Sequence, residues 1–335
     1  MKFRSDIRMT GLGAPFSQEH RTLRWVIRGL TGCVVILLVL GCEGPPLEPW
    51  HTEELTEEFT VNMTGEIQTF EDYRKLEDRL FAQLAEKVYA RTATGPEYAL
   101  VRYSTGSAAD PRRRNPNWNR SFEFATDNPV GGVLLLHGMS DSPYSLRALG
   151  ETLNQRNYWV IGLRLPGHGT APSGLKHISW QDMAAAVRLG MAHLANKVGQ
   201  KPIHLVGYSN GSPLAINYTL DAFEDNALPA PASLVLISPA IGLHPTAALA
   251  KWKRRLSVLP GLGSLAWLSV MPEFDPYKYN SFATNAAEQA HGLARSVARR
   301  IDARARTEAK QILPPTLVFL STVDATVSMD AVVER

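Results

Sequence analysis

The sequence predicts one α/β domain with a mostly parallel central sheet, helices on both faces and an inserted cap. Three observations lead to this fold class. A chain of 335 residues with 44% hydrophobic and 20% charged residues can bury one large core. From about residue 121, short apolar runs alternate with helix-forming stretches, which is typical of a parallel sheet. One interval, from about residue 241 to 312, is too long to be a simple connection.

Each predicted strand is a short apolar run that is followed by a turn or a helix. The strands are Ser121–Ala125, Val133–Leu136, Tyr158–Leu163, Ile203–Val206, Leu234–Ile237 and Thr316–Leu320. The helices between them begin near Pro143, Ser179 and Ser212. The long interval starts with apolar residues interrupted by glycine and proline, and a polar helix from about Asn285 to Ala309 closes it. We therefore expect one α/β domain over 121–335, with residues 241–312 as a helical cap.

The region before this domain divides into three parts. Residues 1–41 are basic and then apolar, and residues 42–68 begin with a proline-containing stretch that predicts an extended tether. Residues 69–120 are predicted to be a helical extension and a loop. An amphipathic stripe runs from Phe70 to Tyr89, and Thr69 with Asp72 resembles a capping box.

The N-terminal segment indicates export. Its apolar run, Gly29–Gly41, is shorter than a membrane-spanning helix of about 20 residues, which favours a signal peptide. The residues Val39-Leu40-Gly41-Cys42 resemble a bacterial lipobox, and this resemblance implies that Cys42 is the lipid-attachment site of a lipoprotein. The alternative is an uncleaved single-pass anchor of the inner membrane from about Trp25. Both place the domain in the bacterial cell envelope, tethered to a membrane and facing the periplasm or the cell exterior.

The charge distribution argues against nucleic acid as a partner. The formal net charge is +3, but residues 1–41 hold six basic and two acidic side chains and contribute +4 of it. The rest of the chain is therefore close to neutral, whereas nucleic-acid binding needs a basic face on the folded domain. The expected partners are a small-molecule substrate and the membrane, and the sequence sets no oligomeric state.

A serine motif follows one of the predicted strands. The segment Gly207-Tyr208-Ser209-Asn210-Gly211 stands between the apolar strand and a helical stretch, in the G-x-S-x-G pattern of a nucleophile elbow. Small residues are needed at 207 and 211 because the serine occupies a tight strand-to-helix turn. The helix that follows directs its positive dipole end at the serine, where negative charge develops. The pattern predicts Ser209 as a nucleophile.

A second motif joins the first to a known superfamily. The strand Leu134-Leu135-Leu136 is followed by His137-Gly138-Met139-Ser140-Asp141-Ser142-Pro143. With the serine motif, it resembles the α/β-hydrolase superfamily, in particular its monoacylglycerol lipase and carboxylesterase branch, which is also called serine aminopeptidase-like. The resemblance implies an oxyanion hole made by the backbone N–H groups of Met139 and Asn210, with Gly138, Gly207 and Gly211 as the glycines of the loop and elbow. It implies that His137 braces the oxyanion loop and is not a base.

Two further segments fit the same resemblance. Leu165-Pro166-Gly167-His168-Gly169-Thr170 is similar to a Pro-Gly-His-Gly loop that shapes one wall of the site, so His168 is expected to be a hydrogen-bonded loop residue. Asp324, after the last predicted strand, matches the aspartate that orients the catalytic histidine. The sequence shows no His-Glu-x-x-His pattern and no cysteine cluster, so we expect no metal and no cofactor.

The catalytic histidine is the departure from the pattern. The superfamily order is serine, aspartate, histidine, but all nine histidines precede Asp324. Three hypotheses follow: a chain that continues beyond residue 335 and carries the last helix, strand and histidine there, a base supplied by His244 or His291 of the cap, or a binding lipoprotein that has lost catalysis. The first is favoured, because 328–335 resembles an interrupted helix and the strand at 316–320 would be an apolar sheet edge.

These patterns lead to an expected activity. We expect a serine hydrolase that cleaves carboxylic esters, of the carboxylesterase or acylglycerol lipase type, through an acyl-enzyme on Ser209. The apolar cap favours an acyl or lipid-like substrate. The alternatives are a hydrolase of small peptides or amides with the same fold and the inactive binding protein. A haloalkane dehalogenase is disfavoured, because that chemistry resembles this fold with an aspartate at position 209.

Overall fold

A computed structural model describes residues 45–241, 263–307 and 312–321. We describe the compact unit of residues 46–335 by itself. The expectations for residues 1–41, Cys42, His244 and Asp324 concern residues outside the described ranges. Within those ranges, no helix combines the length and the apolar character needed to cross a bilayer.

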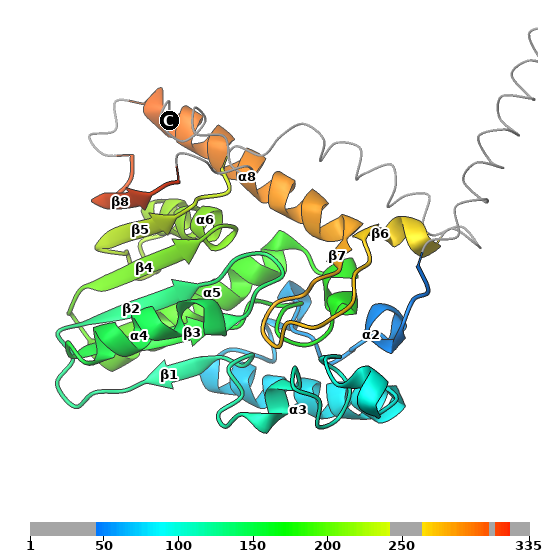
Figure 1. Ribbon diagram of the computed structural model, residues 1–335. Helices are drawn as coiled ribbons and strands as arrows, with labels where there is room; N and C mark the ends of the chain where they lie inside the picture. Colours follow the sequence, from blue (N-terminus) through cyan, green and yellow to red (C-terminus); the bar gives the residue numbers. More distant parts are fainter. Residues whose placement is uncertain (1–44, 242–262, 308–311, 322–335) are drawn as a thin grey trace, which may run out of the picture. The chain divides into compact units, whose positions relative to one another are not determined.

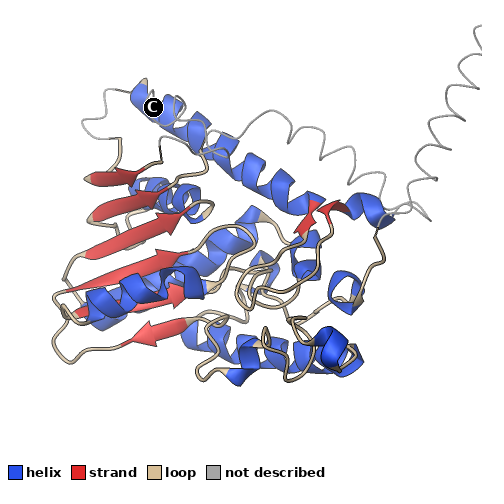
Figure 2. Cartoon of the chain, in the orientation of Figure 1, coloured by secondary structure: helices blue, strands red, loops and turns tan. Residues whose placement is uncertain are grey.

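The centre of the described fold is a twisted sheet with the strand order β1-β3-β2-β4-β5-β8 (Figure 1). The strands are β1 (Phe122–Phe124), β2 (Gly131–Leu136), β3 (Tyr158–Leu163), β4 (Ile203–Tyr208), β5 (Ser233–Ile237) and β8 (Thr316–Phe319). Neighbouring strands are parallel, except that β1 runs antiparallel to β3. Helices cover both faces (Figure 2), which confirms the predicted fold class, and each predicted strand is found within two residues at either end.

Alternate side chains of β2 pack against helices on opposite faces of the sheet. The flanking helices are α4 (Arg147–Asn154), α5 (Trp180–Val198) and α6 (Gly211–Glu224). Leu134 and Leu136 belong to the core formed with α5 and α6, whereas Val133 and Leu135 belong to the core on the α4 side. Both faces are therefore buried, which explains why β2 is apolar along its whole length.

The register of the parallel strands brings three loops to one edge of the sheet. Leu136, at the end of β2, pairs with Leu163 of β3 and with Gly207 of β4. Because these strands end level with one another, the loops that follow them meet at the carboxyl edge. In open α/β sheets this edge is where ligands bind.

The segment before the sheet is packed for most of its length, which corrects one expectation. It contains α2 (Pro49–Thr52) and α3 (Phe70–Lys87), joined by a short 3₁₀ turn (Val61–Met63). We expected residues 42–68 to be a tether, but Trp50, Leu55, Phe59 and Ile67 are at most 7% exposed. The physical reason is that these four apolar side chains bury against the domain, although they follow no regular period in the sequence. The extension therefore begins near residue 46.

In its described residues, the segment between β5 and β8 contains a long helix and a small two-stranded ribbon. Its described elements are η7 (Gly263–Ala266), β6 (Trp267–Ser269), β7 (Phe282–Ala283) and α8 (Thr284–Ala305). The antiparallel pairing of β6 with β7 was not predicted, because two or three residues are too few to show a strand period. Helix α8 lies along α6, and Arg300 Nη1 donates to Asp221 Oδ1 of α6 at 2.7 Å. Most of the apolar part of the expected cap lies outside the described residues.

Candidate active site

Ser209 occupies a strained turn between β4 and α6. Its φ angle is +50°, in the left-handed region that side chains other than glycine rarely adopt. Its backbone N–H donates to the carbonyl of Ile237 at 2.8 Å, and its own carbonyl accepts from the N–H of Ala240 at 3.2 Å. The residue is half-buried. Serine 209 is thus fixed through its backbone at the carboxyl edge of the sheet, outside regular secondary structure.

The two glycines beside Ser209 are required by close backbone approach. A Cβ atom at Gly207 would lie 2.5 Å from Cα of Ser212, and one at Gly211 would lie 2.1 Å from the carbonyl oxygen of Leu136. Real Cβ atoms essentially never come so close to backbone. The turn can therefore form only because both positions lack a side chain, as the sequence motif predicts.

The loop after β2, residues 137–142, lies against the serine. We call it the oxyanion loop. A Cβ atom at Gly138 would lie 3.2 Å from Cβ of Ser209. Met139 is the next residue of this loop, and Asn210 follows the serine directly at the start of α6. The two residues expected to supply the oxyanion hole thus directly follow Gly138 and Ser209, and these two lie against each other. The Asn210 side chain is buried, and its Oδ1 atom has no hydrogen-bond partner among the described residues.

His137 links the oxyanion loop to the loop that follows β3. The N–H of Leu165 donates to His137 Nε2 at 3.1 Å, so Nδ1 carries the ring proton and donates to the carbonyl of Gly138 at 2.8 Å. The ring is fully buried, and this burial, together with nearby His168, holds its pKa well below the ordinary value. Neutral His137 therefore has both nitrogens engaged in bracing the loop, and neither is free to accept a proton from Ser209.

His168 is also a buried loop residue. Its Nδ1 donates to the carbonyl of Pro166 at 2.9 Å, and its ring lies 5.1 Å from the ring of His137. Burial lowers its pKa to about 4. His291, an expected alternative base, lies on α8, and burial with nearby Arg295 lowers its pKa. In the described ranges, no group of three metal-ligating side chains is found.

The buried carboxyl group of Asp141 in this loop was not predicted from the sequence, although the residue stands in the quoted motif. Its Oδ2 would lie 2.7 Å from a Cβ atom at Gly138, which places the carboxyl group next to the residue that contacts Ser209. Burial raises the pKa of Asp141 to about 6, Lys278 lowers it, and Asp275 raises it. The nearest cation, Lys278 Nζ, is 3.9 Å away. The only available signal was an acidic residue in an otherwise apolar and small-residue loop.

Comparisons with known proteins agree with this geometry. A parallel sheet with a serine on a left-handed turn between strand and helix defines the α/β-hydrolase class. Residues 127–334, more than half of the chain, match the serine aminopeptidase S33 family, and the chain belongs to this family. The resemblance of the sequence to the serine aminopeptidase-like branch of the α/β-hydrolase superfamily is therefore confirmed.

Individual relatives are lipolytic or esterolytic by name. Over 202 residues the chain is 28% identical to a thermostable monoacylglycerol lipase of Bacillus sp. (strain H-257). The aligned region covers 60% of this chain and 73% of the lipase. Over 90 residues the chain is 34% identical to a carboxylesterase of Bacillus subtilis (strain 168), and this region covers 26% of this chain and 36% of the carboxylesterase. A solved structure described with LipS and LipT, two metagenome-derived lipolytic enzymes, has a TM-score of 0.51 at 20% identity, with 64% and 80% covered. That last likeness concerns the fold alone.

Proposed function

We propose that this protein is a serine hydrolase that cleaves carboxylic esters with an acyl or lipid-like group through an acyl-enzyme on Ser209. One observation carries the proposal: Ser209 is held at φ +50° at the edge of the sheet, with Gly138 of the oxyanion loop against it. The monoacylglycerol lipase and carboxylesterase relatives support an ester substrate.

The proposed reaction is acyl transfer to the serine and then to water. Ser209 Oγ forms a bond with the ester carbonyl carbon while its proton passes to a histidine base that Asp324 orients. The N–H groups of Met139 and Asn210 stabilise the oxyanion, and the C–O bond to the alcohol breaks as the alcohol takes the proton from the histidine. Water then attacks the acyl carbon by the same steps and releases the acid. Losing one oxyanion donor would lower the rate about 10²–10³-fold.

A fluorophosphonate probe tests the nucleophile. We expect the full-length protein to be labelled on residue 209, and Ser209→Ala to lose both the label and about 10⁶-fold of its turnover on a p-nitrophenyl ester. A matched control is Ser212→Ala, which removes a buried hydroxyl that donates to the carbonyl of Gly207 and leaves Ser209 in place. Equal labelling of the Ser209→Ala variant would refute the proposed nucleophile.

The same protein preparation distinguishes ester hydrolysis from two alternative functions. The family name, serine aminopeptidase, favours amide substrates as a second candidate, so turnover of aminoacyl p-nitroanilides is compared with that of p-nitrophenyl esters of increasing chain length. Faster cleavage of the anilides would replace the ester proposal by the amide one. Absence of both turnover and probe labelling would instead favour a binding protein on this scaffold.

We also propose that the protein is a lipoprotein of the bacterial envelope, anchored through Cys42. The lipobox-like residues before Cys42 support this location. Mass spectrometry of the mature N-terminus tests it, because a lipid-modified Cys42 at the first position and an uncleaved N-terminal segment have different masses.

A further inference from the structure

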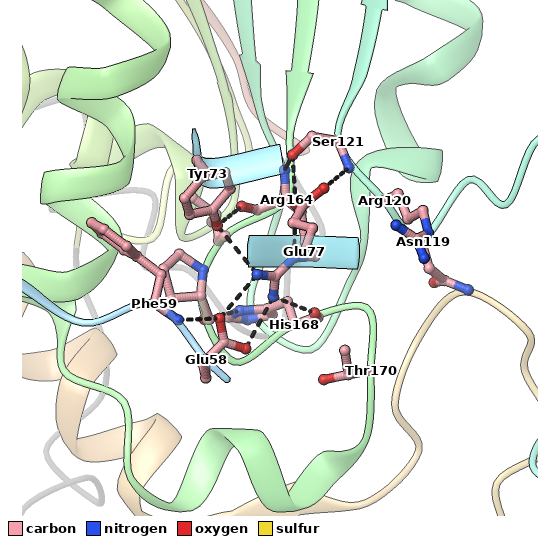
Figure 3. A network of polar contacts seen from close by, with 12 residues as sticks. Glu58, Phe59, Tyr73, Glu77, Asn119, Arg120, Ser121, Arg164, His168 and Thr170 are labelled. Atoms are coloured by element: carbon pink, nitrogen blue, oxygen red, sulfur yellow. Dashed lines mark hydrogen bonds and ion pairs between the residues drawn. The ribbon is translucent and has the colours of Figure 1, made fainter. Parts of the chain in front are cut away.

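Arg164, the first residue after β3, is fully buried, and side chains of the N-terminal extension hold its charge. Its Nη1 and Nη2 donate to the two carboxylate oxygens of Glu58, at 3.0 and 2.9 Å (Figure 3). Its Nε donates to Glu77 Oε1 at 2.8 Å. Burial alone would lower the pKa of Arg164, but Glu58, Tyr73 and Glu77 raise it well above the ordinary value. The guanidinium is therefore charged and depends on acids from a segment that precedes the family match.

The backbone of Arg164 is bound by the same segment. The hydroxyl of Tyr73, on α3, donates to the carbonyl of Arg164 at 2.7 Å. The N–H of Arg164 donates to Ser121 Oγ at 2.9 Å, and that hydroxyl donates to Glu77 Oε1 at 2.8 Å. Side chain, N–H and carbonyl of one residue are thus all fixed by residues 58–121, as Figure 3 shows.

This residue lies one step from the hydrogen bonds that brace the oxyanion loop. Leu165, directly after Arg164, donates its N–H to His137 Nε2, and His137 donates to the carbonyl of Gly138. Arg164 Nη1 also donates to the carbonyl of His168 at 3.1 Å, which closes the loop 164–168 around the guanidinium. The position of Arg164 therefore sets the position of the Leu165 N–H, and through His137 that of the peptide before Met139.

The other side of the oxyanion loop is held in a comparable way. The carbonyl of Ser140 accepts from the N–H of Tyr279 at 2.9 Å, and the Tyr279 hydroxyl donates to the carbonyl of Gly167 at 3.1 Å. The buried guanidinium of Arg102, in the extension, donates to the carbonyls of Gly169 and Lys278, each at 3.3 Å. Segments bound by the extension thus contact the oxyanion loop from two sides.

We propose that the N-terminal extension is a working part of the active site, and that Arg164 with Glu58 and Glu77 is a set of positioning residues for the oxyanion hole. This inference rests on the proposed function. The oxyanion donors act on charge that develops only in the transition state. A displaced donor therefore lowers kcat and leaves KM nearly unchanged.

Glu58→Gln is the sharpest test, because it keeps the size of the side chain and places an NH₂ group against one of the Arg164 donors. Its matched control is the neighbouring Glu57→Gln, which removes an ion pair within the extension, to Arg79 of α3 at 2.9 Å, where both side chains are more than a third exposed. A second, milder variant is Tyr73→Phe, which removes only the hydroxyl that donates to Arg164. All are made in the full-length protein, and folding is checked by thermal unfolding.

Two readouts separate positioning from a merely structural role. The first is kcat and KM on p-nitrophenyl butyrate, with active sites counted by fluorophosphonate titration. We expect kcat per site to fall about tenfold in Glu58→Gln, since a misplaced group costs up to about 10²-fold, with KM changed less than about twofold. The second is hydrogen exchange of the peptide spanning 137–145, which is expected to quicken in Glu58→Gln, less in Tyr73→Phe, and not at all in Glu57→Gln.

The outcomes are distinguishable. If Glu58→Gln and Tyr73→Phe lower the unfolding temperature but leave kcat per titrated site and exchange of 137–145 unchanged, the positioning proposal is overturned. The same applies if Glu57→Gln has an equal effect on both readouts. If the wild-type protein takes no probe and cleaves no ester, the proposed function fails by itself, and the exchange measurement still decides whether the extension fixes the loop.

Discussion

At Gly211 the nucleophile elbow packs directly against the backbone at the end of β2, so a substitution there tests this contact. In Gly211→Ala, the new methyl group would lie 2.1 Å from the carbonyl oxygen of Leu136 and 2.9 Å from that of His137. Both obstacles are backbone, so no side-chain rotation relieves the contact. Since Cβ atoms essentially never come closer than 3.0 Å to such atoms, the start of α6 and the end of β2 must separate by about 1 Å.

That separation acts on the two residues that flank the serine. Helix α6 carries the Asn210 amide, and β2 leads through His137 into Met139, so the two proposed oxyanion donors move apart. A misplacement of about 1 Å costs about 100-fold in rate, which equals about 2.7 kcal/mol of transition-state stabilisation. Overpacking of this kind also costs about 1–3 kcal/mol in the free energy of unfolding.

The assay is turnover of p-nitrophenyl butyrate per titrated active site, with thermal unfolding in parallel. Gly65→Ala is the control, because a Cβ atom at Gly65 meets nothing within 4 Å and that glycine has no positive φ angle. We expect the control to keep wild-type turnover. Turnover of Gly211→Ala within twofold of the wild type, at a normal unfolding temperature, would refute the argument that this contact fixes the oxyanion hole.

Two further predictions concern stability. The pKa of Asp141 is raised from 3.8 to about 6 by burial, so the folded protein holds this proton more tightly than the unfolded chain; its contribution to stability is full below about pH 4 and is lost as the pH rises through about 6. Asp141→Asn should remove most of that loss, so that above pH 6 its free energy of unfolding exceeds that of the wild type by at most about 3 kcal/mol. Urea titrations at pH 4, 6 and 8 measure this difference. If the free energy of unfolding changes with pH in the same way in both proteins, the assignment is contradicted. Gly292, inside α8, has room for a Cβ atom 3.6 Å from Trp180, so Gly292→Ala should raise the free energy of unfolding by up to about 1 kcal/mol, seen as a rise of about 2 °C in Tm. A lower Tm would show that α8 is more tightly packed there than these contacts indicate.

The sheet and the elbow could be predicted because their physical requirements are local. An apolar run such as Val133–Leu136 is visible in the sequence, since a parallel strand is buried on both faces. The pattern around Ser209 is visible because a strained turn next to a helix excludes side chains at fixed positions. In both cases the residues that matter are neighbours in the chain.

The Arg164 cluster could not be predicted because its residues are distant in the sequence. Glu58 lies 106 residues and Glu77 lies 87 residues before the arginine that binds them. An isolated Glu on an amphipathic helix is indistinguishable from a solvated one, and burial of its charge depends on the tertiary contact. The same reason hid the packing of residues 49–67, whose apolar side chains follow no period. It also hid the raised pKa of Asp141, which depends on burial of its carboxyl group in the folded domain.

The dependence of Glu58 and Glu77 on Arg164 also constrains the order of folding. The chain is made from its N-terminus, so helix α3 is complete well before β3 and its arginine exist. During that time Tyr73 and Leu76 of its apolar stripe, which belong to the core formed with α5, have no such helix to cover them. Two acids that end in the core must meanwhile remain hydrated. The extension therefore completes its fold only together with the domain that supplies Arg164.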